Sequence, residues 1–466
     1  MGRSRGLPRP SLRVPRERRP APRHARTPPY LERSPSRADP VSRTPISASL
    51  GAVRRLIVTK QHLSGPGPSR ANPEEIVAMV PMLPYVQWDP VGVVAPSHLL
   101  SIWARLGPFP SSVLDRLMWE EKRLLLLWTP IANLVATDDY PLYASLMQRF
   151  PDSLSGSWGS QRERARKFLT GHGRLRKRIL KELESGPRRV SEFSDHARTR
   201  RNDGEWTPRS DVAQLLEYLH MKGEVMVVGH ARNQNLWGRT DQFLPPWVER
   251  RPLSASETDR AAVQKAIRGL GVATPREINY YYLRGQYRDL RGAVRDLEDA
   301  SRIHQVVVRG VVEKETRYLH DDDVSLLERL ESETLEPRVA LLPPFDNMVQ
   351  MQGRAQTLFG FDYVREQFLP PEKRRFGMWV LPILSGERFV GRMDLQFDKE
   401  GRELRVKAIF AERGTPPDRD AAVGLKDQLE SLAGLLGAQA VKLPSRVPGP
   451  WKEALHGTAV PRGSGH

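Results

Sequence analysis

An internal repeat limits the fold of this chain more than any other feature of its sequence. The segment 210–222 has apolar residues at positions i, i+3, i+4 and i+7, and 290–297 repeats this spacing about 78 residues later. Such spacing predicts an amphipathic helix in both places. Further helices are expected before each of them, and a β-hairpin after each. The hairpin strands are expected at 225–228, 235–237, 303–308 and 316–319.

Helix, helix, helix, hairpin is the element order of a winged helix-turn-helix unit, and two similar units in tandem are hard to explain by chance. We therefore predict an α+β fold with tandem winged helix-turn-helix units followed by a small C-terminal β-barrel. Strands at 377–384, 388–397 and 404–409 predict that barrel, or an open sheet, with a closing helix at 419–436. Helices are also expected at 50–61, 72–83, 99–106 and 113–128, with an extended stretch at 85–94.

These elements divide the chain into six expected segments. They are an Arg/Pro-rich tail at 1–46, a winged-helix-like domain with the candidate catalytic motif at 47–160, winged helices at 161–250 and 251–335, the barrel at 336–442, and a loose tail at 443–466. The first tail has too little apolar surface to offset the entropy of ordering, so we expect disorder. A nucleic-acid-binding arm and an extension without a role explain it equally well.

The positive charge is concentrated in two stretches. The net charge is +18 at pH 7, of which residues 1–43 carry +9 and residues 161–209 carry +8. A concentrated positive stretch in a folded region favours phosphate binding, because each neutralised phosphate releases counterions. A solvated helix face is the alternative. Within this stretch Arg174 and Arg178 lie beside an apolar helical stripe and are candidate DNA contacts.

The composition excludes several kinds of chemistry. The chain has no cysteine, which excludes disulfides, thiol catalysis, Cys-ligated zinc and iron–sulfur clusters. It has no nucleotide-binding, zinc-protease or esterase motif. His320 precedes three aspartates, but consecutive carboxylates converge poorly on one ion, so we expect no metal and no cofactor. No apolar run approaches the ~20 residues that span a bilayer. We expect a cytoplasmic protein that associates with the nucleoid when bound to DNA.

The segment YVQWDPV at 85–91 carries the candidate chemistry. Alternate residues of a strand share a face, so Gln87 and Asp89 are expected to project together while Trp88 points into packing. A carboxylate beside an amide can activate and hold a water molecule, or stabilise a developing cation. A strand end, with Asp89 and Pro90 in a turn and Gln87 on a solvated surface, explains the same residues without a function.

The run VQWDPVGVVAPSHLLSIWARL at 86–106 resembles the start of the crosslink-repair DNA glycosylases of the YcaQ/AlkZ type. These enzymes carry a Gln-hydrophobic-Asp or Gln-hydrophobic-Gln motif, and this chain has the Asp form. The resemblance continues in WTPRSDVAQLLEYLHMKGEVMVVG at 206–229, LLPPFDN at 341–347, LFGFDY at 358–363 and FGMWVLPILSGERFVGRMDLQ at 376–396. It extends over roughly 47–439 and omits both tails.

The resemblance implies tandem winged helices around a DNA-binding concavity, with a C-terminal β-barrel. It also implies hydrolysis of the N-glycosidic bond of bulky N7-alkylguanine adducts or interstrand crosslinks in duplex DNA. Asp89 would act as general base and stabilise the oxocarbenium-like sugar, while Gln87 would orient the attacking water. No cofactor is required. The expected partner is double-stranded DNA containing alkylated purines, and we expect a monomer.

Five further residues are candidate DNA contacts, each with a packing role or a solvated position as the alternative. They are His98, Arg105, Arg354, Lys373 and Arg374. The chain departs from the family in two places. Residues 128–133 lack a histidine that many relatives have, and residues 347–354 differ from the usual Trp-Asp-Arg continuation, so the alignment of Arg354 is loose.

Two readings without catalysis compete with the glycosylase hypothesis. The first is a tandem winged-helix transcription regulator, which needs neither a barrel nor the Gln-x-Asp motif. The second is a lesion sensor, which would bind alkylated DNA tightly without releasing the base.

Overall fold

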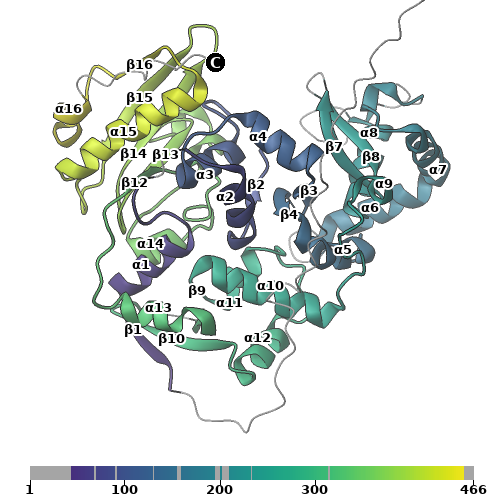
Figure 1. Cartoon of the computed structure of the whole chain (residues 1–466), viewed down its shortest axis with the longest axis horizontal. Coiled ribbons are helices and arrows are strands. Elements are labelled where there is room, and N and C mark those ends of the chain that lie inside the picture. Colours follow the sequence, from purple (N-terminus) through teal and green to yellow (C-terminus); the bar gives the residue numbers. More distant parts are fainter. Residues whose placement is uncertain are drawn as a thin grey trace, which may run out of the picture.

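The computed structural model in Figure 1 describes most of the chain between the two termini. The described residues are 44–67, 70–89, 92–129, 131–154, 159–194, 200–201, 209–231, 234–312 and 315–455. The disorder expected for 1–46 falls almost wholly outside them, although Ile46, which we assigned to that tail, begins the first strand. Within the described ranges, no helix is both long enough and apolar enough to cross a membrane.

The N-terminal third combines short helices with a small sheet. Its elements are β1 (Ile46–Ser49), α1 (Leu50–Lys60), α2 (Pro73–Met79), β2 (Val86–Gln87), α3 (Ser97–Leu106), α4 (Ser111–Asp115), β3 (Leu124–Trp128), β4 (Ala132–Ala136) and α5 (Tyr140–Arg149). Local chemistry fixes the start of α2: the Asn72 side chain accepts from the Glu75 amide, and the Glu75 carboxylate accepts from the Asn72 amide. This reciprocal cap satisfies amides that the first helical turn leaves unpaired.

The helix expected at 113–128 is wrong for its second half. After α4 and a π-helical turn at Arg116–Glu120, the chain turns at Lys122, whose φ is 54°, and enters β3. A run of four leucines suits a buried strand as well as a helix, and here it lies in the middle of the core. β3 pairs with β4, and β4 pairs with β2, giving the strand order β2-β4-β3. This sheet holds the segment that carries Gln87.

The two repeated stretches have the predicted order of elements. The first contains α6 (Gly159–Gly171), α7 (Gly173–Glu182), a short 3-10 turn (Val190–Glu192), α8 (Asp211–Met221), β7 (Val225–Ala231), β8 (Gln234–Arg239) and α9 (Thr240–Phe243). The second contains α10 (Ala255–Leu270), β9 (Val272–Ala273), α11 (Pro275–Tyr280), α12 (Leu290–Asp299), β10 (Ile303–Arg309), β11 (Arg317–His320) and α13 (Val324–Arg329). The predicted hairpins β7–β8 and β10–β11 are confirmed.

The repeat also extends to a detail that the sequence did not predict. In the first stretch Arg188, which follows α7, forms a bridge with Trp237 of β8, the second hairpin strand. In the second stretch β9, which follows α10, pairs with β11, again the second hairpin strand. The second hairpin gains one more strand, because β1 pairs with β10 in parallel. The resulting sheet order is β1-β10-β11-β9, which ties the first described residues to the second repeat.

The small β-barrel predicted for the C-terminal region is confirmed in part, because the region is a curled sheet that stays open. Its elements are β12 (Val339–Leu341), α14 (Arg354–Phe359), β13 (Val380–Ser385), β14 (Arg388–Asp398), β15 (Glu403–Ala411), α15 (Arg419–Leu436), β16 (Ala440–Lys442) and α16 (Gly449–Leu455). The strand order β12-β13-β14-β15-β16 leaves β12 and β16 as edges, so the sheet is a curled half-barrel. In Figure 1, α15 lies along this sheet, on the opposite side of the molecule from α6–α8.

The expectation of a loose tail from residue 443 is wrong for α16. Trp451 and Leu455 are both fully buried and belong to the same core cluster as the C-terminal sheet. Burial of a tryptophan and a leucine provides enough apolar contact to hold a short helix against α15.

Stability should depend on pH because His98 and His220 are buried and His62 is partly buried. Burial, as the largest cause, lowers the pKa of His98 to about 3 and the pKa values of His62 and His220 to about 4. The unfolded chain protonates these groups near pH 6.5, whereas the folded chain keeps them neutral. The contribution of these histidines to the free energy of unfolding is therefore complete above about pH 6.5. It decreases as pH falls, by up to about 1.4 kcal/mol per pH unit for each histidine. Urea unfolding at pH 7.5, 6 and 5 should show this decline, and His220→Gln should reduce it. Equal stability at the three pH values would contradict the assignment.

Candidate active site

The candidate catalytic motif begins at the end of the short strand β2. Val86 pairs with Leu134 and Gln87 pairs with Asn133, and the Trp88 amide donates to the Ala132 carbonyl at 2.8 Å. β2 ends at Gln87, so the extended stretch predicted for 85–94 is regular strand for only two residues. Gln87, Trp88 and Asp89 are all partly exposed, which leaves the motif accessible from solvent.

A cluster of amide side chains surrounds Gln87. The Gln350 Nε2 donates to Gln87 Oε1 at 2.8 Å, across 263 residues of sequence. Asn133 faces Gln87 on β4, and its Nδ2 donates to Thr129 Oγ1 at 2.6 Å. The Oδ1 atom of Asn133 and the Oε1 atom of Gln350 are buried acceptors without a partner among the described residues. Both acceptors belong to side chains next to Gln87.

Sequence reasoning did not identify Asn133 and Gln350 as site residues. Both lie in the two segments where the chain departs from its relatives, 128–133 and 347–354. That coincidence is a signal that could have identified them. Their pairing with Gln87 depends on the β2–β4 register and on a contact between distant segments, which residue spacing does not reveal.

Asp89 lies just after β2 and is joined to the start of α3. Its carbonyl accepts from the Ser97 amide at 3.2 Å. The His98 ring makes a second hydrogen bond to the Asp89 backbone. These contacts fix the backbone at Asp89, while Pro90 and Val91 lie outside the described residues.

Trp88 is part of an aromatic stack. The His98 ring lies 3.9 Å from the Trp88 ring at an interplanar angle of 11°, and the His230 ring lies 5.7 Å away at 3°. Trp119 contacts His230 edge-on. His98 is buried, and its pKa is about 3, because burial outweighs the hydrogen bond to Asp89. His98 is therefore a neutral packing residue that connects Trp88 to α3, and the DNA contact predicted for it is inconsistent with this burial.

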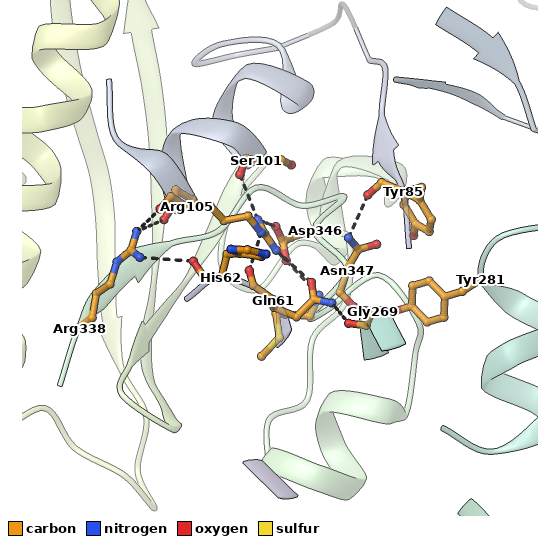
Figure 2. A network of polar contacts seen from close by, with 12 residues as sticks. Gln61, His62, Tyr85, Ser101, Arg105, Gly269, Tyr281, Arg338, Asp346 and Asn347 are labelled. Carbon is orange, nitrogen blue, oxygen red and sulfur yellow. Dashed lines mark hydrogen bonds and ion pairs between the residues drawn. The ribbon is translucent and has the colours of Figure 1, made fainter. Parts of the chain in front are cut away.

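Arg105, a predicted phosphate contact, forms a buried ion pair instead (Figure 2). Its Nη1 and Nη2 donate to the two carboxylate oxygens of Asp346 at 2.6 and 3.0 Å, and the side chains are 0% and 1% exposed. The Arg105 Nε donates to the Gln61 carbonyl at 2.8 Å, and the Gln61 side chain donates to the Gly269 carbonyl. A phosphate contact by Arg105 is inconsistent with this placement, because no donor faces solvent.

The same network reaches the start of β2 through Asn347, the neighbour of Asp346 (Figure 2). The Asn347 Nδ2 donates to the Tyr85 carbonyl at 2.9 Å, and the Tyr281 hydroxyl donates to the Asn347 carbonyl at 2.6 Å. Gln350 follows three residues later and holds Gln87. Segment 346–350 therefore connects α3 to β2.

The other predicted basic residues differ in their surroundings. Arg174 and Arg178 are exposed on α7, where they form a stripe with Lys177 and Lys181 at positions i, i+3, i+4 and i+7, opposite the buried Ile179. We call these four residues the α7 basic stripe. A stripe of this kind can follow a DNA backbone.

Three C-terminal candidates remain. Lys373 is exposed. The Arg374 Nε donates to the carbonyls of Glu366 and Leu369, so this side chain holds its own loop together. Arg354 is buried in an ion pair with Glu277 and donates to the carbonyls of Leu270 and Val272. The phosphate contact predicted for Arg354 is inconsistent with that burial.

Removing one partner of the Arg105–Asp346 pair should destabilise the protein strongly. Asp346→Asn leaves the buried guanidinium uncompensated, which costs about 3–5 kcal/mol. The control is Glu333→Gln, because Glu333 forms an exposed pair with Arg329 and its loss should cost less than about 1 kcal/mol. Denaturant unfolding of the two variants measures the difference, and equal small losses would contradict a structural role for the buried pair.

A family model and a solved structure both match this chain. The family model "DNA glycosylase AlkZ-like" matches residues 80–435, which include β2, the repeats and strands β12 to β15 of the C-terminal sheet. The solved structure of the Streptomyces sahachiroi DNA glycosylase AlkZ is similar, with a TM-score of 0.59 at 17% sequence identity, covering 85% of this chain and 99% of that one. At that identity the structural likeness shows the fold alone. Since the family model spans most of the sequence, the chain belongs to the AlkZ-like family of DNA glycosylases.

Proposed function

We propose that this protein is a DNA glycosylase of the Gln-x-Asp type, which hydrolyses the N-glycosidic bond of bulky N7-alkylguanine adducts or interstrand crosslinks in duplex DNA. The observation that carries the proposal is the amide cluster: in a chain of this family, Gln350 fixes Gln87 at the end of β2, two residues before Asp89. Membership of the family supports DNA as the substrate.

The hydrogen bond from Gln350 decides what Gln87 can do. Because its Oε1 already accepts from Gln350, its amide N–H groups remain to donate to a water oxygen. The buried acceptors Gln350 Oε1 and Asn133 Oδ1 can receive a water proton. Gln87 is thus suited to orient a water molecule, and Asp89 is the carboxylate nearest in sequence that can take its proton.

The chemistry places modest demands on the protein. An N7-alkylguanine is already cationic, so it leaves with the electrons of the C1′–N9 bond without a strong acid. Positive charge develops on the sugar, and the Asp89 carboxylate stabilises it. The water oxygen bonds to C1′ while its proton passes to Asp89. The products are neutral alkylguanine and an abasic site, and no step needs a cofactor.

We propose that the duplex is bound through the two repeated units, as tandem winged helices, by a monomer. A pairing that both units share supports winged helices. Arg188 pairs with β8 in the first unit, and β9 pairs with β11 in the second. The α7 basic stripe supplies the main phosphate contacts from the first unit, and Lys373 is an additional candidate.

The Asp89 role predicts a large loss of base release in Asp89→Asn. The amide keeps the shape of the side chain but cannot take a proton, so the single-turnover rate should fall about 10²–10⁴-fold. The assay incubates the protein with duplex DNA carrying an N7-alkylguanine and measures alkali-labile abasic sites. Asp427→Asn, on the exposed side of α15, is the matched control and should react like the wild type.

The same assay separates the rival functions. Equal base release by Asp89→Asn and the wild type would contradict the mechanism. Tight binding of the adduct without any base release would indicate a lesion sensor, and binding to one specific undamaged sequence would indicate a regulator.

The α7 basic stripe predicts a loss of affinity that is independent of the lesion. Arg174→Gln combined with Arg178→Gln removes two phosphate contacts, so binding should weaken about tenfold or more at low salt for damaged and undamaged duplex alike. Fluorescence anisotropy measures both affinities. The control is Arg419→Gln, at the exposed start of α15, which removes one positive charge outside the stripe. Unchanged affinity in the double variant would exclude the stripe as a DNA contact.

A further inference from the structure

An arginine lies between tyrosine rings beside the candidate active site. The Arg284 guanidinium carbon lies 5.0 Å from the centre of the Tyr85 ring and 4.8 Å from that of Tyr280. Tyr281 stacks on Tyr85 at 5.6 Å and meets Tyr280 edge-on at 5.3 Å. We call Tyr85, Tyr280 and Tyr281 the tyrosine cradle. Aromatic faces attract a guanidinium and fix its orientation.

Arg284 has no ion-pair or hydrogen-bond partner for its side chain among the residues that the structure describes, although its Nε and Nη2 atoms are buried. Arg105 is the informative contrast, since all three of its nitrogens are bonded. Buried donors without acceptors are costly, so an arginine that served only to pack between rings would gain by bonding a neighbouring carbonyl. Arg284 as a whole is partly exposed, so an acceptor from outside can approach it.

The backbone holds Arg284 in an unusual conformation. Its φ is 45°, in the left-handed region, and Gly285 follows with a φ of 85°. Residues other than glycine seldom adopt that region, and such strain persists where surrounding structure imposes it. The turn therefore presents the guanidinium in one place before any ligand arrives.

The cradle is joined directly to the catalytic strand. Tyr85 precedes Gln87 by two residues, and the Tyr280 hydroxyl donates to the Gln350 carbonyl at 3.4 Å. Gln350 in turn donates to Gln87. Arg284 is thus an oriented cation close to the residues that handle the water molecule.

We propose that Arg284 binds a backbone phosphate of the damaged strand immediately beside the lesion. The inference rests on the proposed function and deepens it, by naming the group that places the target sugar against Asp89. The Nη1 atom is the one guanidinium nitrogen of Arg284 that is not buried, so it is the donor that can bond a phosphate oxygen. The sugar itself develops positive charge during hydrolysis, so a cation in this position serves the reaction only by bonding the neighbouring anion.

The test measures phosphate contacts by the salt dependence of binding. The probe is a duplex with one tetrahydrofuran abasic-site analogue, which has no base to release. Arg284→Met keeps an apolar stem between the rings and removes the charge, so the slope of log K against log salt should fall by about 0.9. Arg419→Met, at the exposed start of α15, removes the same charge elsewhere and should keep the wild-type slope. A folded Arg284→Met protein with the wild-type slope would overturn the proposal.

A second measurement needs no variant, so it tests the phosphate contact even if Arg284→Met does not fold. Neutral methylphosphonate replaces the phosphate on either side of the analogue, one at a time. One of the two replacements should weaken wild-type binding about tenfold, and no loss at either position would overturn the proposal. If these results hold while the wild type releases no alkylguanine, the phosphate contact stands and the glycosylase mechanism fails.

Discussion

The buried ion pair between Arg105 and Asp346 is the contact on which the candidate site depends. It joins α3 to the segment before α14, and through Gln61 it reaches the carbonyl of Gly269 at the end of α10. Three parts of the chain that are distant in sequence therefore meet at one guanidinium: α3, the segment before α14 and Gln61. Desolvating two charges is expensive, and the pair offsets that cost because every nitrogen of Arg105 has an acceptor. A mismatch in any of the three parts would leave a charge unpaired, so the network specifies one arrangement.

The consequence for chemistry is that Gln87 is positioned from a distance. Asp346 fixes the segment, Asn347 bonds the Tyr85 carbonyl, and Gln350 holds the Gln87 side chain. A side chain held in this way needs little reorganisation when a water molecule and a sugar arrive, which is how positioned dipoles lower a barrier. The tyrosine cradle and Arg284 border the same strand, so the proposed grip on the phosphate and the proposed water site share one support.

Much of the fold could be predicted because its signals are local. The helices α8, α12 and α15 follow from apolar residues spaced three and four apart, and the hairpins from short alternating runs. The predictions failed where contacts between residues distant in sequence decide the structure. The leucine run of β3 is compatible with helix and strand, and whether a curled sheet closes into a barrel depends on edges that no local pattern describes.

The site was predicted less completely, for a related reason. The sequence shows that Arg105 and Arg354 are charged. It does not show that they form buried ion pairs with Asp346 and Glu277. Gln87 and Asp89 stood out as neighbours in one motif, whereas Gln350 contacts Gln87 from 263 residues away. Arg284 carries no sequence signal either, since its environment consists of a left-handed turn and rings from two separate segments.

The coupling between Gln87 and Gln350 tests most directly whether segment 346–350, which Arg105 anchors, positions Gln87. The measurement is the single-turnover rate of base release for Gln87→Leu, Gln350→Leu and the double variant, with unfolding curves to confirm that all three are folded. If Gln350 acts through Gln87, the double variant should react no more slowly than Gln87→Leu alone. Rate losses that multiply in the double variant would show that the two residues act independently, and would contradict the account.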